Sequence, residues 1–306
     1  MNEETVAQEQ PKTVGEALQY CASALEDSDV FFGHGTDNAW DEAVQLVLSV
    51  ADLPANSGDG VLPHPLDSAS FARLLALLER RISDHVPLPY LLGRAWFAGL
   101  EFLCDERAII PRSPIAELIL HDFQPWYCGH KPERVLDLCC GGGCIGLAVA
   151  HYNPGVTVEL ADMDEKALAL AEENSAHLGL CDRVNIVQSD LFEALGQQRY
   201  NLILSNPPYV NERDLSSMPA EYRHEPEIAL GSGKDGLALT RRILCQAVNF
   251  LDDDGLLVVE VGNSWVELEA LYPNVPFTWL EFECGGHGVF AISAKELQDY
   301  STSFIG

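Results

Sequence analysis

The short motif Asn206-Pro207-Pro208-Tyr209 has the residue types needed to hold a planar NH2 group. Two consecutive prolines fix the backbone and carry no amide hydrogens. The Asn206 side-chain oxygen and the Pro207 carbonyl oxygen are hydrogen-bond acceptors, and an amide or aromatic amine offers two N–H donors to match them. Tyr209 adds a flat face against which a planar group can pack. We therefore predict that these four residues are catalytic and bind the reacting group.

The nitrogen of such a planar group delocalises its lone pair. Two hydrogen bonds to fixed acceptors would orient that lone pair and favour a pyramidal nitrogen as positive charge develops. Positioning and preorganised dipoles would then supply most of the rate gain of an alkyl transfer. No general base is needed beforehand, because the alkylated nitrogen becomes acidic and can lose its proton to water. The motif favours the direct transfer of a methyl group to such a nitrogen; a rigid surface turn is the alternative.

A glycine-rich segment upstream joins a predicted strand to a predicted helix. It reads DLCCGGGCIG over residues 137–146. Glycines let the backbone turn tightly and approach a ligand closely, and ligands of open parallel sheets lie beyond the carboxyl ends of the strands. With Gly146 as a third glycine the loop alone also fits a nicotinamide dinucleotide, and a turn without a ligand is a further alternative.

Acidic residues lie at the ends of three predicted strands, at Asp137, Asp162 and Asp190. Asp162 comes about nineteen residues after Gly143, where a carboxylate can accept both ribose hydroxyls of a nucleoside. Asp190 could accept from an adenine amino group, although an aspartate in this position is commonly a helix cap. The three acids, taken with the motif at 206–209, favour a nucleoside-containing methyl donor over a dehydrogenase cofactor.

The elements that would position these loops alternate from residue 134 onward. The runs that read as strands are 135–139, 157–162, 184–188, 200–205, 255–261, 277–282 and 289–293. Helical stretches lie between them, for example at 165–178 and 237–251. Alternating strands and helices predict an α/β fold of the Rossmann-like kind, in which a mostly parallel sheet of seven strands has helices on both faces.

The first part of the chain has a different pattern. Residues 41–53 and 68–85 carry apolar side chains at helical spacing. Residues 95–111 alternate around a central glycine, as in a β-hairpin, and the Pro-Arg-Ser-Pro sequence at 111–114 ends this pattern. We expect an N-terminal helical domain at 1–92, a β-hairpin linker at 93–113 and the α/β domain at 114–306.

The charge of the chain limits its partners. The 306 residues include 18 basic and 47 acidic side chains, for a formal net charge of −29. Such a surface repels phosphate backbones, so no stable direct nucleic-acid binding is expected. It would speed encounter with a strongly basic partner, because opposite fields attract. The alternative is the general acidity of many cytosolic proteins.

The compartment and the metal content follow from other features of the composition. No run of ~20 apolar residues is present, so no membrane association is expected. The first residues are polar and acidic and lack the features of a secretory signal. Nine cysteines then indicate reduced thiols in the cytoplasm. Cys139, Cys140 and Cys144 lack the second pair of a zinc site, so no metal is expected.

Several segments resemble the HemK-like protein-glutamine methyltransferases. These are DLCCGGGCIGLAVA, ADMDEKALALAEEN, QSDLF and SNPPYV, in that order. Others are similar to the branch of this family that methylates a glutamine of ribosomal protein L-three, namely GHGTDNAWDEAVQLVL, AWFAGLEF, PRSPIAELI, EYRHEPEIALGSGKDGL and PFTWLEFECGGHGVF. The similarity spans about residues 30–295. It implies a class I methyltransferase fold, a helical domain that recognises the substrate, and S-adenosylmethionine as the cofactor.

The resemblance also implies which residues bind the two reactants. For the cofactor these are Asp137, Cys139, Cys140, Gly141, Gly143, Asp162, Met163, Asp190, Leu191 and Asn206. For the substrate they are Asn206, Pro207, Tyr209, Arg112 and Glu225. In this arrangement the glycine-rich loop wraps the methionine part of the cofactor, Asp162 holds the ribose, and Asp190 with Leu191 borders the adenine.

We therefore expect an S-adenosylmethionine-dependent protein-(glutamine-N5) methyltransferase whose partner is a basic ribosomal protein of the large subunit. Methylation of an exocyclic amino group in nucleic acid is an alternative, because that group is also a planar NH2. A glutamine of a release factor is another. A non-enzymatic ribosome-assembly protein with a vestigial cofactor site is a third class, against which the intact Asp162, Asn206 and Tyr209 count.

Overall fold

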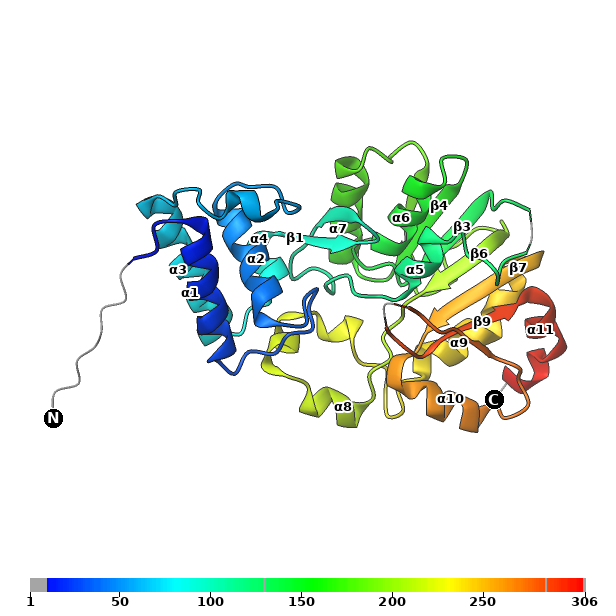
Figure 1. Cartoon of the computed structure of the whole chain (residues 1–306). Coiled ribbons are helices and arrows are strands. Elements are labelled where there is room, and N and C mark those ends of the chain that lie inside the picture. The colour runs from blue at the N-terminus through cyan, green and yellow to red at the C-terminus, as the bar shows by residue number, and fades with distance from the viewer. Residues whose placement is uncertain (1–9, 129, 284, 305–306) are drawn as a thin grey trace. The chain divides into compact units, whose positions relative to one another are not determined.

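The computed structural model describes residues 10–128, 130–283 and 285–304, and the chain divides into two compact units, Met1–Gly93 and Arg94–Gly306. The first unit is helical (Figure 1). Its helices are α1 (Val14–Glu26), α2 (Ala39–Val50), α3 (Ser68–Ser83) and α4 (Leu88–Leu92). Asn38 caps α2 by accepting the Asp41 N–H at 2.9 Å, which starts this helix two residues before the predicted position.

A buried ion pair ties the helices of the first unit to a loop. Arg81 of α3 and Glu42 of α2 are 2% and 3% exposed, and Arg81 Nε donates to Glu42 Oε1. Arg81 also donates to the backbone oxygen of Phe31 at 2.8 Å, and the Thr36 hydroxyl donates to Glu42 Oε2 at 3.2 Å. The pair therefore fixes the path of residues 31–36 between the two helices.

Glu42→Ala should lower the free energy of unfolding by about 3–5 kcal/mol, because it removes the carboxylate that faces a buried guanidinium. Urea unfolding measures the loss. The double variant Glu42→Leu/Arg81→Met is the matched control and should recover most of it, since apolar side chains can replace a buried ion pair. A loss below about 1 kcal/mol in Glu42→Ala would show that the pair contributes little.

The second unit opens with a β-hairpin, β1 (Arg94–Phe97) and β2 (Leu100–Leu103). Its turn residues Ala98 and Gly99 both have positive φ, as tight hairpin turns require. The elements that follow are α5 (Ile115–Leu120), β3 (Arg134–Leu138), α6 (Cys144–Tyr152), β4 (Thr157–Asp162), α7 (Glu165–His177), β5 (Val184–Gln188), β6 (Tyr200–Ser205), α8 (Glu212–Ser217), α9 (Ala238–Gln246), β7 (Leu251–Glu260), α10 (Trp265–Leu271), β8 (Thr278–Trp279), β9 (Val289–Ser293) and α11 (Ala294–Asp299).

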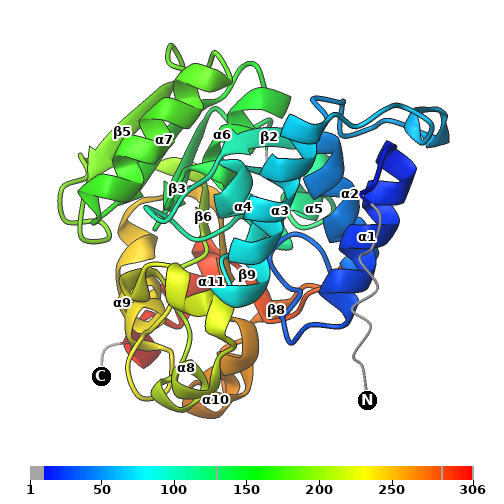
Figure 2. The same cartoon turned by 90° about the vertical axis from the view of Figure 1, so that its left-hand side faces the viewer.

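Seven strands form one sheet in the order β5-β4-β3-β6-β7-β9-β8. The strands from β5 to β7 are parallel, and β9 runs antiparallel to both β7 and β8. Helices lie on both faces of this sheet (Figures 1 and 2). Alternate side chains of the strands enter two separate cores, one packed against α5, α6 and α7 and the other against α9, α10 and α11. The predicted Rossmann-like fold, with a mostly parallel sheet of seven strands, is confirmed.

Several elements differ from their predicted bounds. The hairpin expected over 95–111 ends at Leu103. The helix expected over 237–251 ends at Gln246, and β7 begins at Leu251 rather than at 255. The first residues of β7 were not predicted as strand, because Asp252, Asp253 and Asp254 lack the apolar side chains typical of a buried strand. The strand expected over 277–282 is reduced to β8, which pairs with β9 only at Thr278 and Trp279 on the sheet edge. Among the described residues, no helix is long and apolar enough to cross a lipid bilayer.

Candidate active site

The centre of the sheet brings the two predicted loops together. β3 and β6 are neighbours, and the chain leaves this point of the sheet in opposite directions, toward β4 on one side and β7 on the other. Such a reversal opens a crevice at the carboxyl ends of the strands. Leu138 at the end of β3 lies opposite Ser205 at the end of β6, and the Ser205 hydroxyl donates to the Leu138 oxygen at 2.7 Å. The glycine-rich loop and the motif at 206–209 therefore begin side by side.

The glycine-rich loop is held by the carboxylate of Asp162. One carboxylate oxygen accepts the Gly141 N–H and the other accepts the Asp164 N–H, both at 2.9 Å. Burial raises the pKa of Asp162. Cys139 and Gly141 have φ of 60° and 54°, and the left-handed conformation is costly for the cysteine. A β-carbon on Gly141 would meet only Ala108, at 3.8 Å, so the loop leaves space for a ligand.

Two hollows flank this loop. The larger contains about 680 Å³ of empty space, part of it open to solvent. The predicted cofactor residues on its wall are Cys139, Gly141, Asp162, Met163, Asp190, Leu191 and Asn206. We call it the donor hollow. A second hollow of about 530 Å³ is lined by Cys139, Cys140, Gly141, Cys144 and Asn206, among others, so the loop faces both.

Two predicted cofactor residues support the loop instead of lining a hollow. Asp137 is fully buried and accepts the Gly146 N–H at 2.7 Å, while its Oδ1 has no hydrogen-bond partner within the described residues. Burial raises the pKa of Asp137 to about 7. Gly143 precedes α6 with φ of 80°, and a β-carbon there would come within 2.9 Å of the Leu160 side chain. Both residues therefore support the loop from the side that packs on the sheet and α6.

Asp190 lines the donor hollow but already has a cationic partner. Its carboxylate lies 2.9 Å from an Nη of Arg242 in α9, and Arg242 also approaches Glu193 at 3.6 Å. Leu191 is buried and has φ of 51°, so it is a second non-glycine residue in the left-handed conformation at this hollow. The carboxylate of Asp190 remains 40% exposed and retains room for a further donor.

Part of the wall was not predicted from the sequence. Residues 107–109, which follow the hairpin, cover one side of the donor hollow. The other wall residues that the sequence missed are Asp164, Ala167, Ser189, Ile228, Ala229 and Leu239. The apolar residues just before the Pro-Arg-Ser-Pro sequence at 111–114 could have indicated that 107–109 line a ligand site. Their alternating pattern was interpreted instead as part of a β-hairpin.

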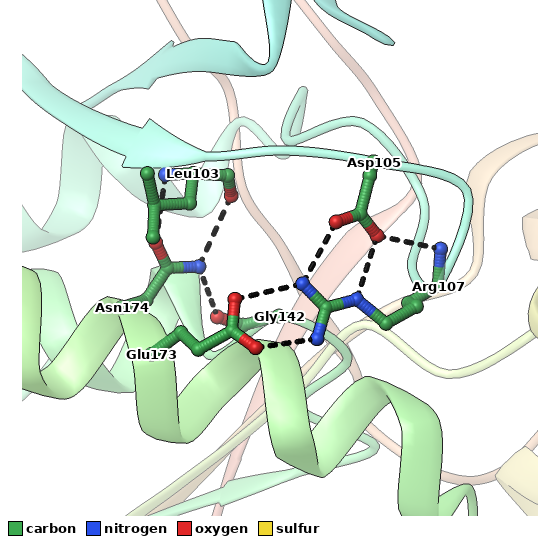
Figure 3. A network of polar contacts seen from close by, with 6 residues as sticks. All are labelled: Leu103, Asp105, Arg107, Gly142, Glu173 and Asn174. Atoms are coloured by element: carbon green, nitrogen blue, oxygen red, sulfur yellow. Dashed lines mark hydrogen bonds and ion pairs between the residues drawn. The ribbon is translucent and has the colours of Figure 1, made fainter.

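A polar network holds residues 103–107 on α7 (Figure 3). The Asn174 side chain accepts the Leu103 N–H at 2.7 Å and donates to the oxygens of Leu103 and Gly142, at 3.2 and 3.0 Å. The Arg107 guanidinium bridges Asp105 and Glu173 with hydrogen bonds of 2.7–2.8 Å. The hairpin therefore belongs to the second unit, and its exit is attached to the same helix that packs under the glycine-rich loop.

In the motif at 206–209, the Tyr209 side chain is held in place by a hydrogen bond and by close packing. The Tyr209 hydroxyl donates to Glu260 at 2.9 Å, and the other Glu260 oxygen accepts from Ser113 at 2.6 Å. Burial raises the pKa of Tyr209 and that of Glu260. Gly262 lies under the tyrosine ring, where a β-carbon would approach a ring atom to 2.5 Å. Within the described residues no hydrogen bond engages the side-chain amide of Asn206.

A third hollow, which we call the acceptor hollow, lies on the far side of Asn206. It contains about 1060 Å³ of empty space. Its wall includes Ile109, Arg112, Asn206, Pro207, Tyr209, Asp214, Tyr222, Asn263 and Ser264. Asn206 and Ile109 line both the donor and the acceptor hollow. A group held by Asn206 in the acceptor hollow would therefore lie next to a ligand of the donor hollow.

Arg112 and Glu225, both predicted to bind the substrate, bind each other. Arg112 makes a bidentate pair with the Glu225 carboxylate, with one distance of 2.7 Å, and Glu225 also accepts the Ile110 N–H at 2.9 Å. Glu225 is 5% exposed, whereas Arg112 lies on the wall of the acceptor hollow with its guanidinium 5.3 Å from the Tyr222 ring centre. The pair joins the segments 110–112 and 222–225.

The fold and the crevice define a class I methyltransferase, and the methyltransferase small domain family matches residues 116–221. The chain is similar to the ribosomal protein uL3 glutamine methyltransferase of Xylella fastidiosa (strain 9a5c), with 47% identity over 93% of this chain and 91% of that protein. The protein of the same name from Xanthomonas campestris pv. campestris is 46% identical over 94% of each chain. The chain belongs to the family of ribosomal protein uL3 glutamine methyltransferases.

A solved structure shares the fold at much lower identity. The hMettl16 catalytic domain in complex with MAT2A 3′UTR hairpin 6 is 17% identical, with a TM-score of 0.51 over 74% of this chain and 82% of that one. At this identity the likeness concerns the fold alone.

Asp137→Asn should remove the part of the pH dependence of the free energy of unfolding that comes from the Asp137 carboxyl. The folded-state pKa of about 7 lies above the ordinary value of 3.8. The wild type therefore loses stability relative to the variant as pH rises through that interval, and the difference stays constant above about pH 7. About 2 kcal/mol of the loss lies between about pH 5.5 and pH 8. Urea unfolding of both proteins at these two pH values measures it; an unchanged difference would contradict the buried acid.

Glu225→Gln should lower the free energy of unfolding by about 1.5–3 kcal/mol, because it removes the charge from two hydrogen bonds to Arg112. Denaturant unfolding measures the change. Glu227→Gln, two residues along and exposed, is the matched control and should change stability by no more than about 0.5 kcal/mol. Equal stability of Glu225→Gln and the wild type would show that the pair does not hold the two segments.

Proposed function

We propose that the chain transfers a methyl group from S-adenosylmethionine to the side-chain amide nitrogen of a glutamine in ribosomal protein uL3, the L-three protein of the large subunit. The observation that carries the proposal is the position of Asn206 on the wall of both hollows. The relatives described above carry the name of this reaction. S-adenosylmethionine supplies a methyl group bound to a positively charged sulfonium.

The donor hollow suits such a cation. Asp162 and Asp190 are on its wall, and Asp137 lies beneath the loop with one buried oxygen that has no partner in the described chain. Each oxygen of Asp162 already accepts one backbone N–H and can accept another hydrogen bond, which fits the two hydroxyls of a ribose. Leu191 and Met163 offer apolar surface for an adenine. These residues, with Cys139, Cys140, Gly141 and Gly143 of the loop, form the proposed cofactor site.

The acceptor hollow supplies two oxygens for the glutamine amide. We assign the side-chain oxygen of Asn206 and the carbonyl of Pro207 as acceptors for the two amide hydrogens, and Pro208 keeps this turn rigid. Hydrogen bonds to both hydrogens orient the nitrogen lone pair toward the donor hollow. The nitrogen would gain the methyl group as the bond from that carbon to sulfur breaks and leaves a neutral thioether, and the alkylated nitrogen would release one proton to water. Tyr209 packs against the amide plane, since its hydroxyl is already bound by Glu260.

Arg112 and Glu225 have different roles in this proposal. The Arg112 guanidinium keeps N–H groups beyond those that bind Glu225, so it can contact the substrate from the wall of the acceptor hollow. Glu225 acts through Arg112, because its own carboxylate is buried and bound. The sequence-based assignment of Glu225 to the substrate is therefore retained as a positioning role.

The remaining parts of the proposal concern the partner. The net charge of −29 suits a basic ribosomal protein and opposes stable direct contact with nucleic acid. We propose that the helical residues 1–92 recognise this protein, that the hairpin region 93–113 connects them to the catalytic residues 114–306, and that the reaction takes place in the cytoplasm, where ribosomal proteins are made.

Asn206→Ala should leave the dissociation constant of S-adenosylmethionine nearly unchanged and lower turnover of uL3 by about 10²–10³-fold, by analogy with the loss of one preorganised hydrogen bond in a reacting site. Calorimetry and transfer of a labelled methyl group measure the two quantities. Wild-type turnover in this variant would defeat the assigned role.

Asp162→Ala is the matched control on the donor side. It should weaken cofactor binding by about 1.5–3 kcal/mol, the effect of losing a hydrogen bond to a charged group. Mass spectrometry of the labelled protein identifies the acceptor. A methyl group on an atom other than a glutamine amide nitrogen, or on RNA and not on uL3, would overturn the proposed function.

A further inference from the structure

One face of α10 exposes large apolar side chains. Trp265 and Val266 are 37% and 53% exposed, and Glu269 lies one turn after Trp265 on the same side of the helix. The Trp265 ring meets the ring of Trp279 edge-on, with centroids 5.8 Å apart. The indole N–H of Trp279 donates to Glu269 at 2.8 Å. We call Trp265, Val266, Glu269 and Trp279 the indole patch.

The chain around the indole patch is acidic. Between Arg242 and Lys295 the sequence has eight acidic residues and neither a lysine nor an arginine. Six of the eight are exposed, and four of these six lie between α10 and residue 283, namely Glu267, Glu269, Glu281 and Glu283. None of these four forms an ion pair within the described residues. An exposed indole face beside carboxylates without a cation is suited to a lysine or arginine side chain.

The indole patch continues the wall of the acceptor hollow. Asn263 and Ser264 line that hollow, and α10 begins at the next residue, Trp265. The Ser264 hydroxyl donates to the backbone oxygen of Tyr209 at 3.0 Å, which fixes the start of α10 to the motif that is proposed to bind the amide. A polypeptide whose glutamine enters the acceptor hollow would therefore pass close to Trp265.

We propose that the indole patch binds a lysine or arginine side chain of the polypeptide that carries the target glutamine. The cation lies against the Trp265 ring and is neutralised by Glu269. This inference rests on the proposed function, and it names a surface that selects a basic substrate. A second copy of this chain is a poorer occupant, because a net charge of −29 on each copy would repel the other.

The test compares variants of the full chain with purified uL3 as the probe. Trp265→Ala should raise the KM for uL3 by about three- to tenfold, the effect of one cation–π contact, and leave kcat and the dissociation constant of S-adenosylmethionine unchanged. Trp265→Phe keeps an aromatic face and should retain most of the affinity. Glu269→Gln keeps an acceptor for Trp279 and should raise the KM with a shallower salt dependence.

Trp126→Ala is the matched control. Trp126 is 40% exposed, as Trp265 nearly is, but it borders a hollow with Asp254 near the start of β7, at the opposite end of the sheet from the active site. This variant should behave as the wild type. An unchanged KM in Trp265→Ala, a change shared with Trp126→Ala, or a fall in kcat alone would overturn the inference.

Direct binding of uL3 separates this inference from the proposed function. If the wild type does not methylate uL3, the proposed function is wrong. The dissociation constant of uL3 then decides the inference independently: weaker binding in Trp265→Ala than in Trp126→Ala supports the indole patch, and no measurable binding of uL3 to the wild type overturns it.

Discussion

The pairing of β3 with β6 is the constraint on which the active site depends. Leu138 and Ser205 end these strands at the same level, and the Ser205 hydroxyl bonds to the Leu138 oxygen. A shift by one residue would turn every side chain of β6 to the other face of the sheet. The glycine-rich loop and the turn at 206–209, which is proposed to bind the amide, start from this pair, so the sheet sets the spacing between them.

Buried carboxylates make up the second layer of the site. Asp137 and Asp162 hold the glycine-rich loop through backbone N–H groups, and Glu260 holds Tyr209 and Ser113. Burial raises the pKa of each of these acids, because the low-dielectric interior makes their ionised form costly. A positively charged donor near Asp137 and Asp162 would offset that cost. The same groups that shape the loop therefore suit the cationic methyl donor that the proposed function requires.

The sequence predicts the fold well because the strands and helices of an α/β sheet have distinct apolar periods. It also places the loop at 137–146 and the turn at 206–209, since ligands of such sheets lie at the strand ends. It does not predict that Ile109 and Ile228 line the donor hollow, because only the tertiary fold brings these distant segments together. The mutual pairing of Arg112 and Glu225, 113 residues apart, is likewise invisible in a single sequence.

The donor and acceptor hollows differ in the parts of the chain that build their walls. The donor hollow is built on the ends of β3, β4 and β5, which the sheet itself fixes. The acceptor hollow is built largely from segments outside the sheet, namely the hairpin exit, α8 and the chain that leads into α10. Asn206 belongs to both. Under the proposed function, the sheet would therefore fix the chemistry at a planar NH2, whereas the choice of the molecule that presents it would depend on segments that can vary without disturbing the strands.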